Sequence, residues 1–212
     1  KKKITKKTKA IICVHLGGNP CEMYGLKKIA YKNKIKIIED CSQAHGASIN
    51  NKQIGSFGDI STWSFCNDKI ISTLGEGGMI STNNKRLYEF CQRYINHGVS
   101  LNKKPNSEKF LYNKNYFGTN LRITEMQSYS GLAQLKELKK VQNKREKMAK
   151  SYYDLISKHQ NYFQCYYPPK KIKSAWYRFY FFVNKDVKLF NNLRFEIIKK
   201  LKNSKIICFT GS

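Results

Sequence analysis

The sequence has few acidic residues and few arginines. It contains 14 Asp and Glu against 40 Lys and Arg, a formal net charge of +26 over 212 residues. Such a charge raises the question of nucleic-acid binding. However, only 6 of the basic residues are arginine, and the lysines are spread along the chain together with many Asn and Ile, as an AT-rich genome produces. We therefore predict no nucleic-acid partner and keep a basic nucleic-acid-binding protein as the lesser alternative.

Long apolar runs and paired cysteines are also missing. No run is long enough to span a membrane, and no secretory signal is recognisable. The seven cysteines are odd in number and form no C-x-x-C pair, which argues against a disulfide framework and a zinc site. We predict a cytoplasmic protein with no metal and no membrane partner. The chain starts at Lys1 and stops at Ser212, and we expect both ends to be cuts within a longer chain.

The first forty residues predict a βαβ unit. Residues 10–15 form a short apolar run, residues 22–33 carry apolar side chains at helical spacing, and residues 35–40 form a second apolar run. A strand, a helix and a strand in so few residues indicate two parallel strands. Ligands in such sheets bind beyond the carboxyl ends of the strands, and Asp40 stands at such an end.

The rest of the chain predicts further strands and helices of an α/β protein. We expect strands at 59–65, 78–82, 176–183 and 205–209, helices at 84–96 and 187–202, and a mobile loop at 98–115. Residues 124–159 predict one long amphipathic helix or two. Its apolar side would carry Met126, Leu132, Leu135, Leu138, Val141 and Met148.

One lysine stands in a position that suits Schiff-base chemistry. Lys69 follows the predicted strand 59–65 and precedes a glycine-rich turn at 75–78, while Asp40 ends the neighbouring predicted strand. Enzymes that use pyridoxal 5′-phosphate (PLP) need a lysine for the aldehyde and an Asp for the pyridinium nitrogen. By composition alone, Lys69 is one surface lysine among 34 and Asp40 an ordinary strand-end or helix-capping residue.

Five sequence blocks in one order carry a family resemblance. They are EDCSQAHG at 39–46, GSFGD at 55–59, SFCNDK at 64–69, GEGG at 75–78 and GTNLRITEMQ at 118–127. Together they resemble the signature of the DegT/DnrJ/EryC1/StrS family of PLP-dependent sugar aminotransferases. The similarity extends from His15 to Phe182, and members of the family are considerably longer than this chain.

The resemblance implies roles for five residues. Lys69 would link to the cofactor aldehyde and later move a proton between substrate and cofactor. Asp40 would keep the pyridine nitrogen protonated, Gln43 would bind the ring hydroxyl, and Ser64 would bind the phosphate. Asn120 would reach the phosphate of the neighbouring subunit's cofactor, which implies a homodimer with shared sites.

Four other matching residues receive weaker roles. We interpret His15 and His45 as packing or hydrogen-bonding groups rather than as chemical ones. Arg122 and Arg178 are candidates for a substrate carboxylate or phosphate, although a structural ion pair is the common alternative. A dehydrating branch of the family has histidine at the lysine position, so Lys69 favours transamination.

The resemblance implies PLP-dependent transferase fold type I, a mostly parallel sheet between helices. Residues 1–140 would form part of the large PLP-binding domain. Residues 141–212 would form a linking helix and an incomplete small α+β domain. The implied reaction moves an amino group from an amino acid, expected to be glutamate, to a nucleotide-linked keto sugar for polysaccharide or antibiotic sugar synthesis. A non-catalytic PLP-fold protein, for example a regulator, remains the alternative.

Overall fold

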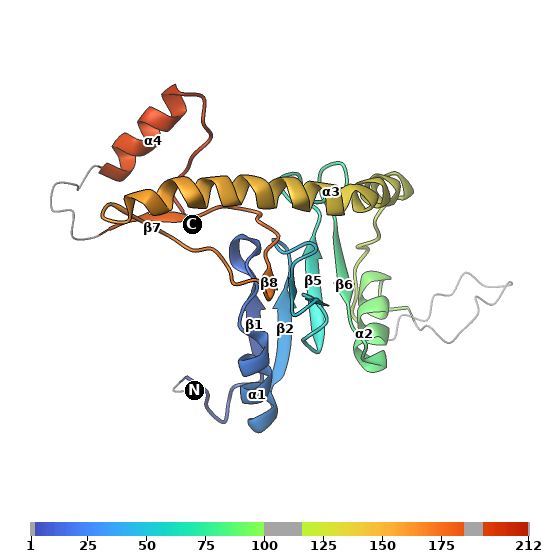
Figure 1. Cartoon of the computed structure of the whole chain (residues 1–212). Coiled ribbons are helices and arrows are strands. Elements are labelled where there is room, and N and C mark those ends of the chain that lie inside the picture. Colours follow the sequence, from blue (N-terminus) through green and yellow to red (C-terminus); the bar gives the residue numbers. More distant parts are fainter. Residues whose placement is uncertain (1–2, 100–115, 185–192, 212) are drawn as a thin grey trace, which may run out of the picture.

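A mixed four-stranded sheet forms the centre of the molecule. A computed structural model describes residues 3–99, 116–184 and 193–211 (Figure 1). The strand order is β1-β2-β5-β6. The strands are β1 (Ala10–Val14), β2 (Lys36–Asp40), β5 (Ile60–Ser64) and β6 (Gly78–Ser81). The first three run parallel and β6 is antiparallel to β5, so the predicted α/β class and mostly parallel sheet are confirmed.

The predicted βαβ unit is present at the start of the chain. Helix α1 (Met23–Lys32) connects β1 to β2 and buries Met23 and Ala30. The side chain of Glu22 caps this helix by accepting a hydrogen bond from Gly25 N at 2.8 Å, which satisfies one of the free amides of the first turn. The buried core under α1 continues through Ile35, directly before β2, to Ile37 within β2.

The register of β2 and β5 decides which side chains share a face. Asp40 is paired with Thr62, and Glu39 is paired with Ser61. Because side chains alternate between the faces of a strand, Asp40, Thr62 and Ser64 lie on one face of the sheet. Glu39, Ser61 and Trp63 lie on the other face.

Segments from the last third of the chain return to the first third. Strand β3 (Ser48–Ile49) pairs with both β4 (Lys52–Gln53) and β8 (Ile172–Lys173). The segment that follows β8 then hydrogen-bonds to the loop after β1, with Ala175 N donating to Gly18 O at 2.9 Å. A separate pair is formed by β7 (Phe163–Cys165) and β9 (Phe181–Val183).

One long helix crosses the end of the sheet. Helix α3 (Glu125–Ile156) runs without a break past residue 140, and Figure 1 shows it lying across the end where β2 and β5 lead into their loops. A capping box between Thr124 and Gln127 fixes its first turn. Helix α2 (Lys85–Ile95) begins after the cap Asn84, and α4 (Leu193–Asn203) lies near the end of the chain. Two short 3-10 helices span Leu16–Gly18 and Ser157–His159.

The predicted apolar side of α3 is only partly correct. Leu138 and Val141 pack against the core. Four of the other predicted core positions are instead exposed, namely Met126, Leu132, Leu135 and Met148. The buried positions of α3 are Gln142 and Ala149. Hydrophobicity alone therefore did not predict the face that this helix turns toward the sheet.

Two predicted strands differ from the structure. Residues 205–209 are irregular, and within 176–183 only β9 is a strand. The stretch 174–178 hydrogen-bonds to a loop rather than to a strand, which its aromatic, strand-like composition did not reveal. The predicted helix at 187–202 is present as α4 from Leu193, while residues 185–192 and most of the predicted 98–115 loop lie outside the described residues.

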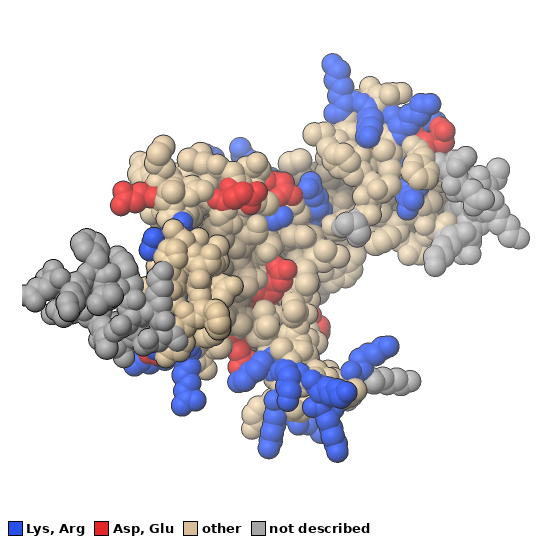
Figure 2. All heavy atoms as spheres, turned by 180° about the vertical axis from the view of Figure 1, so that it is seen from behind, with Lys and Arg blue, Asp and Glu red and all other residues tan. Residues whose placement is uncertain are grey.

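The surface carries two kinds of patch. Basic side chains gather over the end of the molecule that bears α1 (Figure 2), where Lys27, Lys28, Lys32 and Lys34 are exposed. Large apolar side chains are exposed elsewhere, on β1, β6, α2 and the first half of α3; they include Ile12, Ile80, Phe90, Met126 and Tyr129. Over the described ranges, no helix combines the length and hydropathy needed to cross a membrane.

Candidate functional site

Asp40 and Ser64 end neighbouring parallel strands on the same face of the sheet. Asp40 Oδ1 accepts a hydrogen bond from Ser42 N at 3.0 Å, which fixes the carboxylate in the turn after β2. Ser64 Oγ accepts only a long hydrogen bond, from Cys66 N at 3.4 Å. Within the described part of the chain, Asp40 Oδ2 and the Ser64 hydroxyl hydrogen are left available for a ligand.

Lys69 lies in the turn that follows β5. Its backbone N–H donates to Cys66 O at 3.1 Å, which closes the turn, and its side chain is only 14% exposed. The Lys69 amine lies 3.1 Å from Asp68 Oδ1 and 5.1 Å from the centre of the Tyr177 ring. The lysine is therefore a largely buried amine with an anionic neighbour, beyond the carboxyl end of β5.

Gln43 connects the turn after β2 to the loop after β1. Its Oε1 accepts from Gly17 N at 2.6 Å. Gly17 has φ of +66°, and a Cβ there would lie 2.4 Å from the Tyr180 ring, so the close approach requires glycine. The amide nitrogen of Gln43 makes no hydrogen bond to any described residue, so it remains free to donate to a bound group.

Asn120 is not brought to the other four predicted residues. It is exposed and lies in an isolated bridge with Asn96, and its Oδ1 accepts from Arg122 N at 3.4 Å. Within the described ranges, no hydrogen bond or ion pair joins Asn120 to Asp40, Gln43, Ser64 or Lys69. Its predicted role, which requires a neighbouring subunit, stays a prediction.

Three glutamines of α3 hold the loops around Lys69. Gln134 makes two bonds to Ser72, with Oε1 accepting from its N–H at 3.0 Å and Nε2 donating to its carbonyl at 2.7 Å. Gln127 Nε2 donates to Glu76 O at 2.9 Å, and Gln142 Nε2 donates to His45 O at 3.1 Å. Spacings of seven and eight residues place these side chains on one helix face. They explain why α3 turns a polar face toward the sheet.

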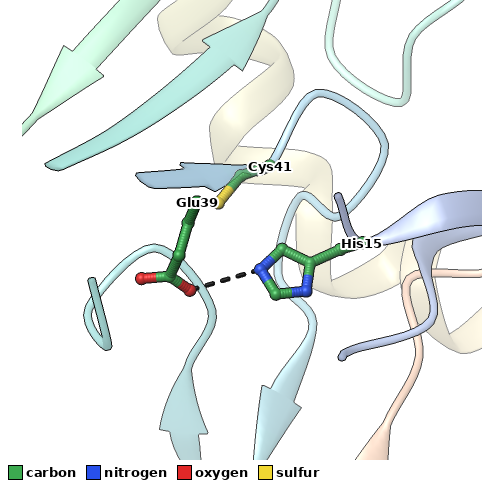
Figure 3. A group of neighbouring side chains, drawn as sticks. All are labelled: His15, Glu39 and Cys41. Carbon is green, nitrogen blue, oxygen red and sulfur yellow. Dashed lines mark hydrogen bonds and ion pairs between the residues drawn. The ribbon is translucent and has the colours of Figure 1, made fainter. Parts of the chain in front are cut away.

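Directly before Asp40, Glu39 is a fully buried carboxylate on the opposite face of the sheet, and its side chain points toward His15 (Figure 3). Its two oxygens accept from the backbone N–H groups of Gly55, Phe57 and Gly58 at 2.9, 2.7 and 2.6 Å. His15 Nε2 lies 3.2 Å from Glu39 Oε2. Because Cys21 N–H donates to His15 Nδ1 at 3.0 Å, we assign the ring proton to Nε2, which donates to Glu39.

The cluster of His15, Glu39 and Cys41 has the residue types of a metal site but not the free donors. The ligand atoms of these three residues lie within 4.8 Å of one another. Burial raises the pKa of Glu39, but hydrogen bonds from His15 and the 55–58 amides outweigh this and lower it, so the carboxylate is ionised and its oxygens are engaged. Burial raises the pKa of the Cys41 thiol and keeps it protonated. We therefore interpret the cluster as a hydrogen-bonded structural unit, as the sequence predicted for His15.

His45 is buried between aromatic rings. Its ring centre lies 5.5 Å from that of Trp63 and 5.8 Å from that of Phe65, which confirms the predicted packing role. Neither ring nitrogen has a hydrogen-bond partner in the part of the chain that the structure describes. Burial lowers the pKa of His45 from 6.5 to about 4; the charge of Lys69 acts in the same direction, and the Ser64 backbone opposes it.

The buried imidazole predicts acid sensitivity. The folded state favours neutral His45, so the neutral imidazole contributes to the free energy of unfolding. This contribution is fully present above the unfolded pKa of 6.5 and is lost as the pH falls toward 4. We expect the wild-type protein to lose about 2 kcal/mol of unfolding free energy between pH 7 and pH 5 relative to a His45→Leu variant. Urea unfolding of both proteins at the two pH values measures this difference. A His159→Leu variant, altered at an exposed histidine, is the control, and an equal pH response in wild type and His45→Leu would contradict the assignment.

The match to known proteins extends over almost the whole chain. The sequence model of the DegT/DnrJ/EryC1/StrS aminotransferase family matches residues 1–209. The chain belongs to this family. The five blocks that carried the resemblance contain Asp40, Gln43, Ser64, Lys69 and Asn120.

The names of several similar proteins refer to nucleotide sugars. GDP-perosamine synthase of Escherichia coli O157:H7 is 43% identical over 135 residues, 64% of this chain and 35% of that protein. An aminotransferase of Psychrobacter cryohalolentis superimposes with a TM-score of 0.90 at 37% identity, covering 99% of this chain and 55% of that one. The E. coli GDP-4-keto-6-deoxy-D-mannose-3-dehydratase with bound hydrated PLP has a TM-score of 0.85 at 29% identity, with 98% and 54% covered. The chain thus spans about a third to about half the length of these relatives, and their fold type I architecture is also its own.

Sequence reasoning missed several residues that the structure places around Lys69. Asp68 and Gln127 were part of recognised blocks but received no role, and Tyr177, Gln134 and Gln142 were not considered. Asp68 contacts Tyr177 across 109 residues of sequence, and Gln134 contacts Ser72 across 62. The adjacency of Asp68 to Lys69 was the one sequence signal that an interaction existed.

Proposed function

We propose that the protein is a PLP-dependent aminotransferase that moves an amino group from an amino acid, expected to be glutamate, to a nucleotide-linked keto sugar. One observation carries the proposal: a largely buried lysine follows β5, and a carboxylate and a hydroxyl end β2 and β5 on one face of the sheet. The membership of the chain in a family of aminotransferases supports the reaction class. GDP-perosamine synthase and the other nucleotide-sugar relatives support the substrate class.

The donors and acceptors left free at this edge fit PLP. A protonated pyridine nitrogen needs a carboxylate, and Asp40 Oδ2 is free to accept within the described residues. A ring hydroxylate needs a donor, which the Gln43 amide nitrogen supplies. A phosphate needs hydroxyl and amide donors, of which Ser64 supplies one. We propose Asn120 as a further phosphate ligand, acting across to a second subunit.

Bound PLP supplies an electron sink for the carbon that gains or loses the amino group. In the proposed reaction Asp40 keeps the pyridine nitrogen protonated, because its negative charge favours the cationic ring. Gln43 orients the ring through the hydroxyl, and Ser64 anchors the phosphate. Lys69 Nζ binds the cofactor and, once free, moves a proton at the substrate carbon, because it is a largely buried amine just beyond the carboxyl end of β5.

The exposed apolar side chains support an assembly larger than this chain. Tyr88, Phe90, Met126 and Tyr129 are exposed on α2 and the start of α3. We propose that a second copy and the segments present in longer relatives cover them, so that the working unit is a cytoplasmic homodimer with shared sites. The proposed division into a large domain (1–140) and a linking helix with a small domain (141–212) would place the boundary within α3.

Visible absorbance of the full-length protein tests the function. After incubation with PLP we expect a yellow band, and after adding glutamate we expect the band to disappear while 2-oxoglutarate forms. A keto-sugar nucleotide should then restore the band and yield an amino sugar, whereas a deoxygenated sugar would indicate the dehydrating branch. A folded protein without the band would overturn the proposal and favour a non-catalytic PLP-fold protein.

A further inference from the structure

Asp68, the residue directly before Lys69, is the centre of a small charge cluster. Its Oδ1 lies 3.1 Å from Lys69 Nζ and accepts from Cys66 Sγ at 2.9 Å. Its Oδ2 accepts from the Tyr177 hydroxyl and lies 3.6 Å from Arg178 Nη2. Oδ1 therefore has two partners in the turn that contains Asp68, and Oδ2 has two in the 177–178 segment, so the carboxylate bridges the two segments.

The segment that bears Tyr177 and Arg178 is itself fixed to the loop after β1. Ser174 Oγ donates to Gly18 O at 2.9 Å, and Arg178 N donates to Gly17 O at 3.1 Å. Tyr177 is buried at 8% exposure, and its ring lies beneath both cations, 5.1 Å from Lys69 Nζ and 4.7 Å from Arg178 Cζ. Asp68 is therefore held in place by a firmly bonded segment, although its side chain is 50% exposed.

The charges around Lys69 favour its ammonium form. The groups that face it are Asp68, Cys66, Tyr177 and Arg178, with the neutral His45 farther away on the opposite face of the sheet. Burial lowers the pKa of Lys69, but the hydrogen bond to Asp68 and the nearby Tyr177 outweigh burial and raise it. Hydrogen bonds from Cys66, Tyr177 and Lys69 lower the pKa of Asp68. In contrast to a lysine made nucleophilic by burial, this amine is protonated at rest.

We propose that Asp68 is a positioning residue that holds the Lys69 amine as an ammonium ion in the cofactor-free protein and so sets the pH at which this lysine becomes nucleophilic. The inference rests on the proposed function, in which Lys69 binds the cofactor aldehyde. An ammonium nitrogen has no lone pair for attack, so it must first lose a proton. The proton goes to solvent water, because Asp68 is a weak base and half exposed.

Competitive labelling of cofactor-free, full-length protein measures the pKa of this one amine. Acetic anhydride is applied in trace amounts between pH 7 and pH 11, and the acetylated Lys69 peptide is quantified by mass spectrometry, normalised to its plateau at high pH. We expect the pKa of Lys69 to be about one unit lower in Asp68→Asn than in wild type, which makes Lys69 label about tenfold faster at pH 8. Equal pKa values in the two proteins would overturn the proposal.

Two further variants keep the test decisive. Arg178→Gln removes a cation that competes for Asp68, so the pKa of Lys69 should rise, opposite to the effect of Asp68→Asn; a fall would contradict the cluster. The matched control is Asp154→Asn, which removes the carboxylate 2.5 Å from Lys150 on the surface of α3 and should leave Lys69 labelling unchanged. Circular dichroism verifies that each variant is folded. If Asp68→Asn does not fold, the effect of Arg178→Gln on the pKa of Lys69 decides the test.

The labelling test of Asp68 and the absorbance test of the proposed function can fail independently of each other. Labelling reads the lysine without any cofactor, so a lowered pKa in Asp68→Asn supports the inference about this pair even in a protein that forms no yellow band. A band that forms normally together with an unchanged Lys69 pKa would refute the role of Asp68 and leave the aminotransferase proposal intact. If Lys69 binds PLP and Asp68 sets the pKa of Lys69, the pH dependence of PLP attachment should shift to lower pH in Asp68→Asn. The shift should equal the change in the pKa of Lys69.

Discussion

Replacing Lys69 with alanine is expected to abolish the absorbance band of covalently linked PLP and to lower turnover by about a thousandfold or more. The variant removes the proposed nucleophile for the cofactor and the proposed base for the substrate carbon, and a positioned base alone contributes about a hundred- to ten-thousandfold. Asp40 and Ser64 remain, so PLP should still bind without a covalent link. Absorbance between 300 and 500 nm and single-turnover amino transfer measure the two losses.

Two comparisons separate the chemistry of Lys69 from its charge. Lys69→Arg keeps a cation beside Asp68 but presents no nucleophilic amine, so we expect it to lose the band as completely as Lys69→Ala. Lys147→Ala, at an exposed position of α3, should leave band and turnover unchanged. Retention of the covalent band and of turnover in Lys69→Ala would refute the assignment, since another lysine would then carry the reaction.

Replacing Glu39 with alanine is expected to lower the free energy of unfolding by about 3–5 kcal/mol. The side chain is fully buried and accepts from three backbone amides of the 55–58 loop and from His15. Without the carboxylate those donors are buried and unsatisfied, and each unsatisfied donor costs about 1–3 kcal/mol before relaxation. Urea unfolding at pH 7, followed by circular dichroism, measures the change.

A surface carboxylate provides the matched control for Glu39. Glu137 lies 3.2 Å from Lys140 on an exposed part of α3, so Glu137→Ala should cost less than about 1 kcal/mol. Glu39→Gln should fall between the two, because its amide oxygen still accepts while its NH2 group faces backbone donors. An unfolding midpoint in Glu39→Ala equal to that of wild type would show that the loop amides find water or other acceptors.

Glu39 also connects stability to the proposed site. It is adjacent to Asp40 in β2, and the two side chains lie on opposite faces of the sheet because strand side chains alternate. One face anchors the 55–58 loop while the other presents the carboxylate to the proposed cofactor. A fall in PLP affinity is therefore expected to accompany the loss of stability in Glu39→Ala.

The sequence predicted those parts of the fold whose signals are local. Strands β1, β2, β5 and β6 and helices α1, α2 and α4 follow apolar runs, helical spacing and caps within a few residues. The strand predicted at 205–209 is absent because an apolar run records only a preference for burial, and the described residues provide no strand that pairs with it. The exposed leucines of α3 show the same limit, since periodicity identifies an apolar face but not what covers it.

By itself, the sequence determined the family, the order of the motifs and the residue types of the proposed site, including Asp40, Gln43, Ser64 and Lys69. Those properties depend on residue identity and short spacing. Only the tertiary structure decided how these residues are held. Hydrogen bonds join segments that are separated by 16 to 109 residues. They are the bonds between Asp68 and Tyr177, between Gln134 and Ser72, and between Glu39 and three loop amides. Such contacts arise when strand register and helix orientation bring distant loops together, and no local pattern encodes them.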